Sequence, residues 1–341
     1  MGTVIYNKKM TKETLFFNAN IYSKYRAELM GVATLFIILC HMPAQSVAMP
    51  SIMARIIGSA GFGCDIFLFL SGMGMWYSME SVRKGDINIF KWYYKRYIRI
   101  IIPYLLIVIP ICFIHKNDFI TTIIRATGFD YFVFKYALWF VSCILVLYLI
   151  TPIIDKLLTS SIKWVYCFIL IVPCLLFFYI NIGDGIINNW QFVISRFPSY
   201  FIGYTLGYNI KNHRMISITN MIVLPLILYC ILYFFNHKMG CNFTLFWLQG
   251  IPIMTITTLL LSKINNSKIN STLSFLGKLS LESYATNVLV LPLMKSWSWS
   301  INGFSINWGN WTFYIVGTIL CLLISWIVNQ FSKIILNRII H

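Results

Sequence analysis

The chain has 341 residues, of which 59% are hydrophobic and 11% are charged, and its formal net charge is +17. Its mean hydropathy is +0.75. Soluble globular domains carry about a quarter of their residues as charged side chains, so this composition excludes a soluble protein and indicates an integral membrane protein.

The first 27 residues are polar and basic. They contain no apolar stretch followed by a small-residue cleavage site, as a secretory signal peptide would. We therefore expect residues 1–27 to form a cytoplasmic N-terminal segment and the first membrane span to be retained.

Ten apolar runs of roughly spanning length follow along the chain. They cover residues 29–48, 57–79, 98–114, 136–154, 164–180, 197–208, 216–235, 243–261, 276–294 and 311–331. The run at 197–208 is short and contains Gly203-x-x-x-Gly207, a weak signal for close helix packing. No repeat or linker divides the chain. We predict an all-α fold, a polytopic membrane helical bundle of about ten transmembrane helices, forming one domain over residues 28–341.

Lysine and arginine positions predict the orientation of these spans. If the N-terminus is cytoplasmic, most of the 27 Lys and Arg residues fall in cytoplasmic segments, as the positive-inside rule requires. We therefore expect both termini in the cytoplasm. Basic loops facing anionic lipid headgroups account for most of the net charge. We therefore predict membrane lipids as partners, and no nucleic acid.

Cysteines and short motifs give little functional information. The nine cysteines form no Cys-x-x-Cys pair and show no His/Cys ligand spacing, so we predict no metal site. Nucleotide-binding glycine motifs, a serine nucleophile elbow and a zincin motif are also absent from the sequence.

His41 lies near the end of an apolar run, residues 29–42, that contains no other ionisable side chain. An ionisable residue within a membrane is costly unless it is partnered or used, and it therefore marks a candidate functional site. The structural alternative is a histidine satisfied by a neighbouring helix.

A basic and aromatic stretch at residues 90–103 is denser than membrane orientation requires. Arg96 and Arg99 are three residues apart and share one helical face at the cytoplasmic mouth. Guanidinium groups bind phosphates well, which suits a phosphate-bearing donor from the cytoplasm. On charge alone, a lipid-headgroup anchor explains the stretch equally well.

Six stretches in order along the chain resemble acyltransferase family 3, the polytopic bacterial O-acyltransferases. They are KYRAELMGVA at 24–33, running on to His41, then GFGCDIFLFLSG at 61–72, the basic stretch at 90–103, LWFVS at 138–142, RFPSYFIG at 196–203 and LGKLSLESY at 276–284. Two positions depart from the family pattern. Met30 stands where an arginine is usual, so that role falls to Arg26 or is lost, and Asn287 replaces a histidine.

The resemblance implies a membrane O-acyltransferase of the bacterial inner membrane. It implies acetyl-CoA as the acyl donor, with no permanently bound cofactor, and a carbohydrate acceptor: a hydroxyl of a cell-envelope or exported polysaccharide, or of its lipid-linked precursor. His41 would act as general base on that hydroxyl, or else as a nucleophile that carries the acyl group.

The predicted site residues fall into two groups. The catalytic group is His41, Asp65 and Glu28, and the donor-binding group is Arg26, Arg96, Arg99, Ser71, Trp139 and Glu282. Structural roles are the alternatives for several of them: a buried polar contact for Asp65, an ion pair with Arg26 or Arg96 for Glu282, and packing or cavity lining for Ser71 and Trp139.

Two other function classes fit the same pattern. A transporter or flippase of an anionic or lipid-linked substrate would also show ten spans, basic mouths and a single membrane histidine. A non-catalytic family member would bind acyl-CoA or sugar without turnover. The acceptor, the acyl chain length and a possible homo-oligomeric state are left open by the sequence.

Overall fold

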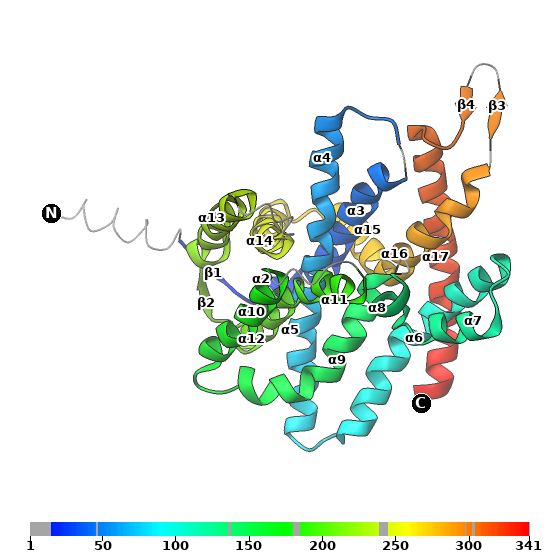
Figure 1. The fold of residues 1–341 in the computed structure, drawn as a ribbon. Helices are drawn as coiled ribbons and strands as arrows, with labels where there is room; N and C mark the ends of the chain where they lie inside the picture. Colours follow the sequence, from blue (N-terminus) through cyan, green and yellow to red (C-terminus); the bar gives the residue numbers. More distant parts are fainter. Residues whose placement is uncertain are drawn as a thin grey trace.

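A computed structural model of the chain describes residues 15–45, 47–135, 138–179, 185–238, 245–296, 298–301 and 304–340 (Figure 1). Helices dominate this part of the chain. Its strands form two short antiparallel pairs, β1 (Phe16–Asn18) with β2 (Met215–Ser217), and β3 (Trp299–Ile301) with β4 (Phe304–Ile306).

Most helices coincide with the apolar runs of the sequence. In chain order the α-helices are α2 (Ile21–Lys24), α3 (Arg26–Ala44), α4 (Ser51–Ser59), α5 (Gly63–Arg83), α6 (Ile89–Ile114), α7 (Phe119–Ala126), α8 (Asp130–Phe134), α9 (Trp139–Leu158), α10 (Lys163–Tyr179), α11 (Ile186–Ile194), α12 (Phe197–Lys211), α13 (Leu224–Lys238), α14 (Phe246–Ile264), α15 (Ser267–Lys278), α16 (Ser280–Leu289) and α17 (Trp311–Ile340). The long helix α6 begins where Asn88 accepts a hydrogen bond from the backbone N–H of Lys91, at 2.7 Å, a standard N-cap.

Seven helices in the described part of the chain are long and apolar enough to cross a membrane. This confirms the predicted all-helical, multi-pass membrane class, while the count of ten spans and the orientation of the termini stay predictions. The runs at 164–180, 197–208 and 276–294 hold shorter elements in the described residues: α10, α12, and the end of α15 with α16. Most of α12 is buried among other helices, so this helix needs little lipid-facing length.

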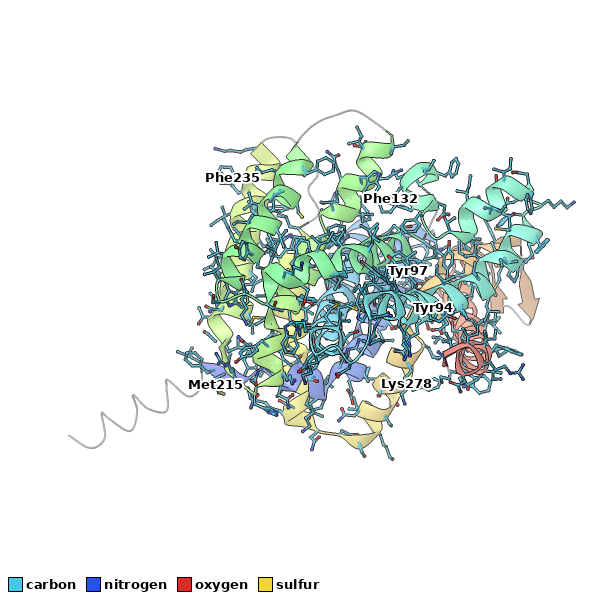
Figure 2. The ribbon with its side chains drawn as sticks, turned by 90° about the horizontal axis from the view of Figure 1, so that it is seen from below. Tyr94, Tyr97, Phe132, Met215, Phe235 and Lys278 are labelled. Atoms are coloured by element: carbon cyan, nitrogen blue, oxygen red, sulfur yellow. The ribbon has the colours of Figure 1, made fainter. Side chains whose placement is uncertain are left out.

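The two ends of the bundle differ. The turn between α5 and α6 and the end of α17 lie at the bottom of Figure 1, while α4 and the β3–β4 pair lie at the top. Figure 2 views the molecule from below, with Tyr94 and Tyr97 of α6 and Lys278 at the end of α15 labelled. By the positive-inside rule, this lower end is the one we expect to face the cytoplasm.

Glycines bring α5 and α12 into backbone contact. A Cβ atom at Gly203 would lie 2.1 Å from the backbone oxygen of Phe69, and one at Gly72 would lie 2.1 Å from that of Tyr200. At Gly207 a Cβ would lie 2.4 Å from Cγ of Trp76. The packing predicted for Gly203-x-x-x-Gly207 is therefore confirmed, because only hydrogen fits at both positions.

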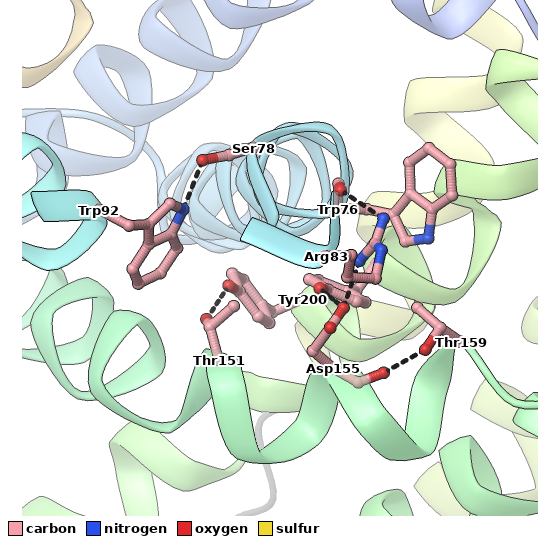
Figure 3. Close-up of polar contacts among 9 residues, drawn as sticks. Trp76, Ser78, Arg83, Trp92, Thr151, Asp155, Thr159 and Tyr200 are labelled. Atoms are coloured by element: carbon pink, nitrogen blue, oxygen red, sulfur yellow. Dashed lines mark hydrogen bonds and ion pairs between the residues drawn. The ribbon is translucent and has the colours of Figure 1, made fainter. Parts of the chain in front are cut away.

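Polar contacts join the second halves of α5 and α9 to the first half of α12 (Figure 3). Asp155 accepts hydrogen bonds from Arg83 and from the hydroxyl of Tyr204. The hydroxyl groups of Thr151 and Tyr200 lie 2.5 Å apart. Buried polar groups that satisfy one another in this way fix the register of neighbouring helices, so these contacts hold α5, α9 and α12 in place against one another.

The N-terminal residues that are described pack onto the bundle. Tyr22 of α2 is fully buried, and its hydroxyl lies 2.7 Å from that of Thr255 in α14. The predicted boundary at residue 27 stays a prediction, and residues 1–14 lie outside the described residues.

Asp130, at the start of α8 and outside the membrane spans, predicts a pH-dependent stability. The residue is 1% exposed, and neither of its carboxylate oxygens has a hydrogen-bond partner in the described part of the chain. Burial raises the pKa of Asp130 to about 6. Because this exceeds the pKa of about 3.9 expected in the unfolded chain, the folded state loses stability as the pH rises from about 4 to 6.

We therefore expect the Asp130→Asn variant to be more stable than the wild type at pH 7.5, by about 1–3 kcal/mol, and by only about a third of that at pH 4.5. Thermal unfolding in detergent at the two pH values measures the difference. Asp86→Asn, at an exposed turn position, is the control. An equal gain at both pH values would contradict an ionised Asp130 as the cause.

Candidate active site

His41 lies near the end of α3 and faces α16. Its Nδ1 atom is 2.9 Å from Oδ1 of Asn287, and its ring centroid is 6.2 Å from that of Tyr284. Both partners are buried, whereas His41 is half-buried. No further hydrogen bond of the imidazole is found among the described residues, so one ring nitrogen is held by a neighbouring helix and the other is free.

A cavity of about 160 Å³ lies between α3, α5, α6, α9 and α16. Its walls are mostly apolar, with hydroxyl groups from Ser71, Tyr148, Ser280 and Tyr284. Ile37, one turn before His41, also lines it. Ser71 therefore lies where the cavity-lining alternative placed it.

Three arginines gather beside Tyr148. Arg96 lies within electrostatic range of Tyr148, Arg99 and Arg26, and Arg26 interacts with Tyr148 as well. None of the three forms an ion pair in the described part of the chain. The Nε atoms of Arg26 and Arg96 are buried without a hydrogen-bond partner there. Among the residues that the structure describes, this is a cluster of cations with no carboxylate paired to it.

Arg26 therefore joins the two arginines of α6, although the usual arginine position of the family pattern holds Met30. Arg26 begins α3, and a Cβ atom at Gly74 of α5 would lie 3.4 Å from its Nη2. Met30, one turn later, lines the cavity instead. The geometry favours the interpretation in which the arginine role passes to Arg26.

Asp65 forms a buried ion pair with Arg196. Ser199 donates a hydrogen bond to the other carboxylate oxygen of Asp65 at 3.0 Å. The guanidinium carbon of Arg196 lies 4.2 Å from the ring centroid of Phe246 and 5.3 Å from that of Trp139. The hydrogen bonds of Asp65 thus link α5 to α12, which is the structural alternative, and its catalytic role stays a prediction.

Trp139 belongs to the surroundings of this ion pair. Its indole lies over Arg196 and packs edge-on against Phe192, with centroids 5.0 Å apart. Phe140, the next residue, lines the cavity. The predicted donor contact of Trp139 stays a prediction.

The two glutamates lie away from His41. Glu28 precedes His41 by thirteen residues on the same helix, which is about 20 Å of axial rise. Glu282 accepts a hydrogen bond from Asn329 of α17 at 2.9 Å and forms no ion pair with Arg26 or Arg96. The roles predicted for Glu28 in catalysis and for Glu282 in donor binding are untested by this geometry.

Two residues without an assigned role are brought into the site. Asn287 entered the sequence argument as a departure from a family pattern, yet it is the hydrogen-bond partner of His41. Arg196 begins one of the family-like stretches, and it neutralises Asp65. The signal for this second pair was present in the sequence, because a lone carboxylate and a lone guanidinium in apolar runs are expected to pair.

Comparisons with known proteins identify the family. Neither the curated proteins nor the solved structures contain a match to this chain. The model of a family described as an acyltransferase domain matches residues 29–330. This range includes His41, Arg96, Arg99 and Asn287 and extends over nearly the whole helical bundle. The chain therefore belongs to acyltransferase family 3, and its apolar helices make it a multi-pass membrane acyltransferase.

Proposed function

We propose that the protein transfers an acetyl group from cytoplasmic acetyl-CoA to a hydroxyl of a cell-envelope or exported polysaccharide, or of its lipid-linked precursor. It would do so in the bacterial cytoplasmic membrane. One observation carries the proposal: a single cavity is lined by Tyr148, beside the unpaired arginines, and by Tyr284, beside His41.

The arginine end of the cavity suits the donor's phosphates. Half-buried cations without carboxylate partners are costly; this applies to Arg26 and Arg96, which the phosphates of CoA would neutralise together with the exposed Arg99 beside them. Guanidinium groups bind phosphate oxygens through paired, charge-assisted hydrogen bonds. The neighbouring apolar walls, with the Ser71 hydroxyl, suit the neutral arm that carries the thioester.

The histidine end suits the chemistry. His41 would take the proton of the acceptor hydroxyl as the oxygen attacks the thioester carbonyl. A carbon–oxygen bond forms, the carbon–sulfur bond breaks, and the proton held by His41 passes to the departing thiolate of CoA. Positioned proton transfer of this kind contributes about 10² to 10⁴ in rate.

The distance between the two ends supports a donor and an acceptor that meet inside the membrane. Arg26 and His41 lie at opposite ends of α3, about 22 Å apart along its axis. A donor held by its phosphates at the cytoplasmic mouth therefore needs a long arm to reach His41. CoA, with its phosphates at one end and its thioester at the other, has this form.

Turnover by the purified protein tests the proposal. The detergent-solubilised enzyme is incubated with acetyl-CoA and surface glycans extracted from its host, and both thioester consumption and acetylated glycan are measured. Acetylated product that requires both substrates supports the proposal. Binding of glycan or lipid precursor without any binding of acetyl-CoA would favour a transporter instead.

A further inference from the structure

Asn287 is placed to control the protonation of His41. It is 1% exposed, and its Oδ1 atom faces Nδ1 of the imidazole at 2.9 Å. A side-chain amide oxygen is only an acceptor, so with Oδ1 turned toward the ring this contact requires the tautomer that carries its proton on Nδ1. A neutral imidazole with its proton on Nδ1 has its free lone pair on Nε2.

The neighbouring residues hold Asn287 in this position. Thr286 faces α17, where its hydroxyl lies 2.8 Å from that of Ser325 and donates to the backbone oxygen of Cys321 at 3.2 Å. The ring of Tyr284 packs beside His41. The short helix α16 is thus fastened to α17 by Thr286 and Glu282 and presents Asn287 to α3.

We propose that Asn287 is a positioning residue that keeps the proton of His41 on Nδ1 and so makes Nε2 the base. This inference rests on the proposed function, in which His41 accepts the proton of the acceptor hydroxyl. An amide does this without adding a negative charge. A carboxylate in its place would stabilise the imidazolium form. His41 would then stay protonated up to a higher pH, and in that form it cannot act as a base.

The tautomer itself is measured without any turnover. The protein is labelled with ¹⁵N-histidine, and the ring signals of His41 are assigned by their loss in a His41→Gln variant. We expect the chemical shifts of a protonated Nδ1 and an unprotonated Nε2 at neutral pH. The inference would be overturned if the wild type showed the opposite tautomer. It would also be overturned if no substitution at position 287 changed the tautomer, even if the enzyme is fully active.

Kinetics of three variants then test the role. Asn287→Leu keeps the size and removes the acceptor, and we expect kcat to fall by about 10- to 100-fold, the effect of one hydrogen bond to a group that becomes charged. The KM for acetyl-CoA is expected to change little. Asn287→Asp keeps an acceptor, so we expect activity above that of Asn287→Leu, with the acid limb of the pH profile moved to higher pH.

Thr286→Val is the matched control, because it removes a buried hydroxyl one residue away that contacts α17 and not His41. If Asn287 had a purely structural role, Asn287→Leu and Thr286→Val would lower the thermal stability alike, and Asn287→Asp would leave the pH profile of kcat unmoved. That result would contradict the inference. If the wild-type protein showed the expected tautomer but no turnover at all, the proposed function would be refuted and the contact that positions His41 would still stand.

Discussion

Replacing His41 by alanine is expected to lower kcat for acetyl transfer by about 10² to 10⁴, the usual contribution of a positioned general base. The affinity for acetyl-CoA is expected to stay within about threefold, because the arginines that would hold its phosphates lie at the opposite end of α3, roughly 22 Å away. The experiment compares product formation and acetyl-CoA binding for both proteins in the same detergent.

His115→Ala serves as the control for this variant. His115 follows the end of α6 and is exposed, so its loss is expected to leave both quantities unchanged. Full turnover by the His41→Ala protein would exclude His41 as the base. A loss of acetyl-CoA binding equal to the loss of turnover would show that His41 holds the donor and does not act on the acceptor.

Replacing Arg26 or Arg96 by glutamine is expected to weaken acetyl-CoA binding by about 10- to 100-fold for each arginine, because each removes one charge-assisted contact to phosphate. Acetyl-pantetheine lacks the nucleotide phosphates. We expect its turnover by the variants to match that of the wild type within about twofold. Binding of acetyl-CoA is measured by titration, and turnover of both donors is measured at saturating acceptor.

Lys91→Gln is the matched control, since Lys91 is an exposed cation near the start of the same helix α6. Its replacement removes the same charge from the same end of the bundle but from outside the arginine cluster. Equal losses for acetyl-CoA and acetyl-pantetheine in the Arg96→Gln protein would mean that the arginine supports the fold or the cavity and does not hold phosphate.

The class of fold was predictable because long apolar runs have few alternatives to a membrane helix. The number of membrane spans was harder to predict. Hydropathy measures the apolar length of a helix, but α12 is enclosed by protein, and α16 is a short helix separated from α15 at Leu279. Neither arrangement leaves a clear mark on the local sequence.

The site was predictable where a single residue carried the signal. His41 and the two arginines of α6 stand out in apolar or aromatic surroundings. The contact of His41 with Asn287 joins residues 246 positions apart, and the Asp65–Arg196 pair joins residues 131 positions apart. Such contacts depend on which helices pack together, and no spacing in the chain encodes that directly.

The glycine contacts have a mechanical consequence for how a substrate could enter. At Gly72 and Gly203 the backbones of α5 and α12 touch with no side chain between them. A Cβ at Gly277 would lie 2.1 Å from the backbone oxygen of Ala27, so α3 and α15 are joined in the same way. These pairs are stiff. The short α16 follows α15 after the single residue Leu279 and carries Ser280, Tyr284 and Asn287. We therefore expect any opening of the cavity to leave α3 and α5 in place and to move α16 together with α17, because Thr286 and Glu282 bond it to that helix.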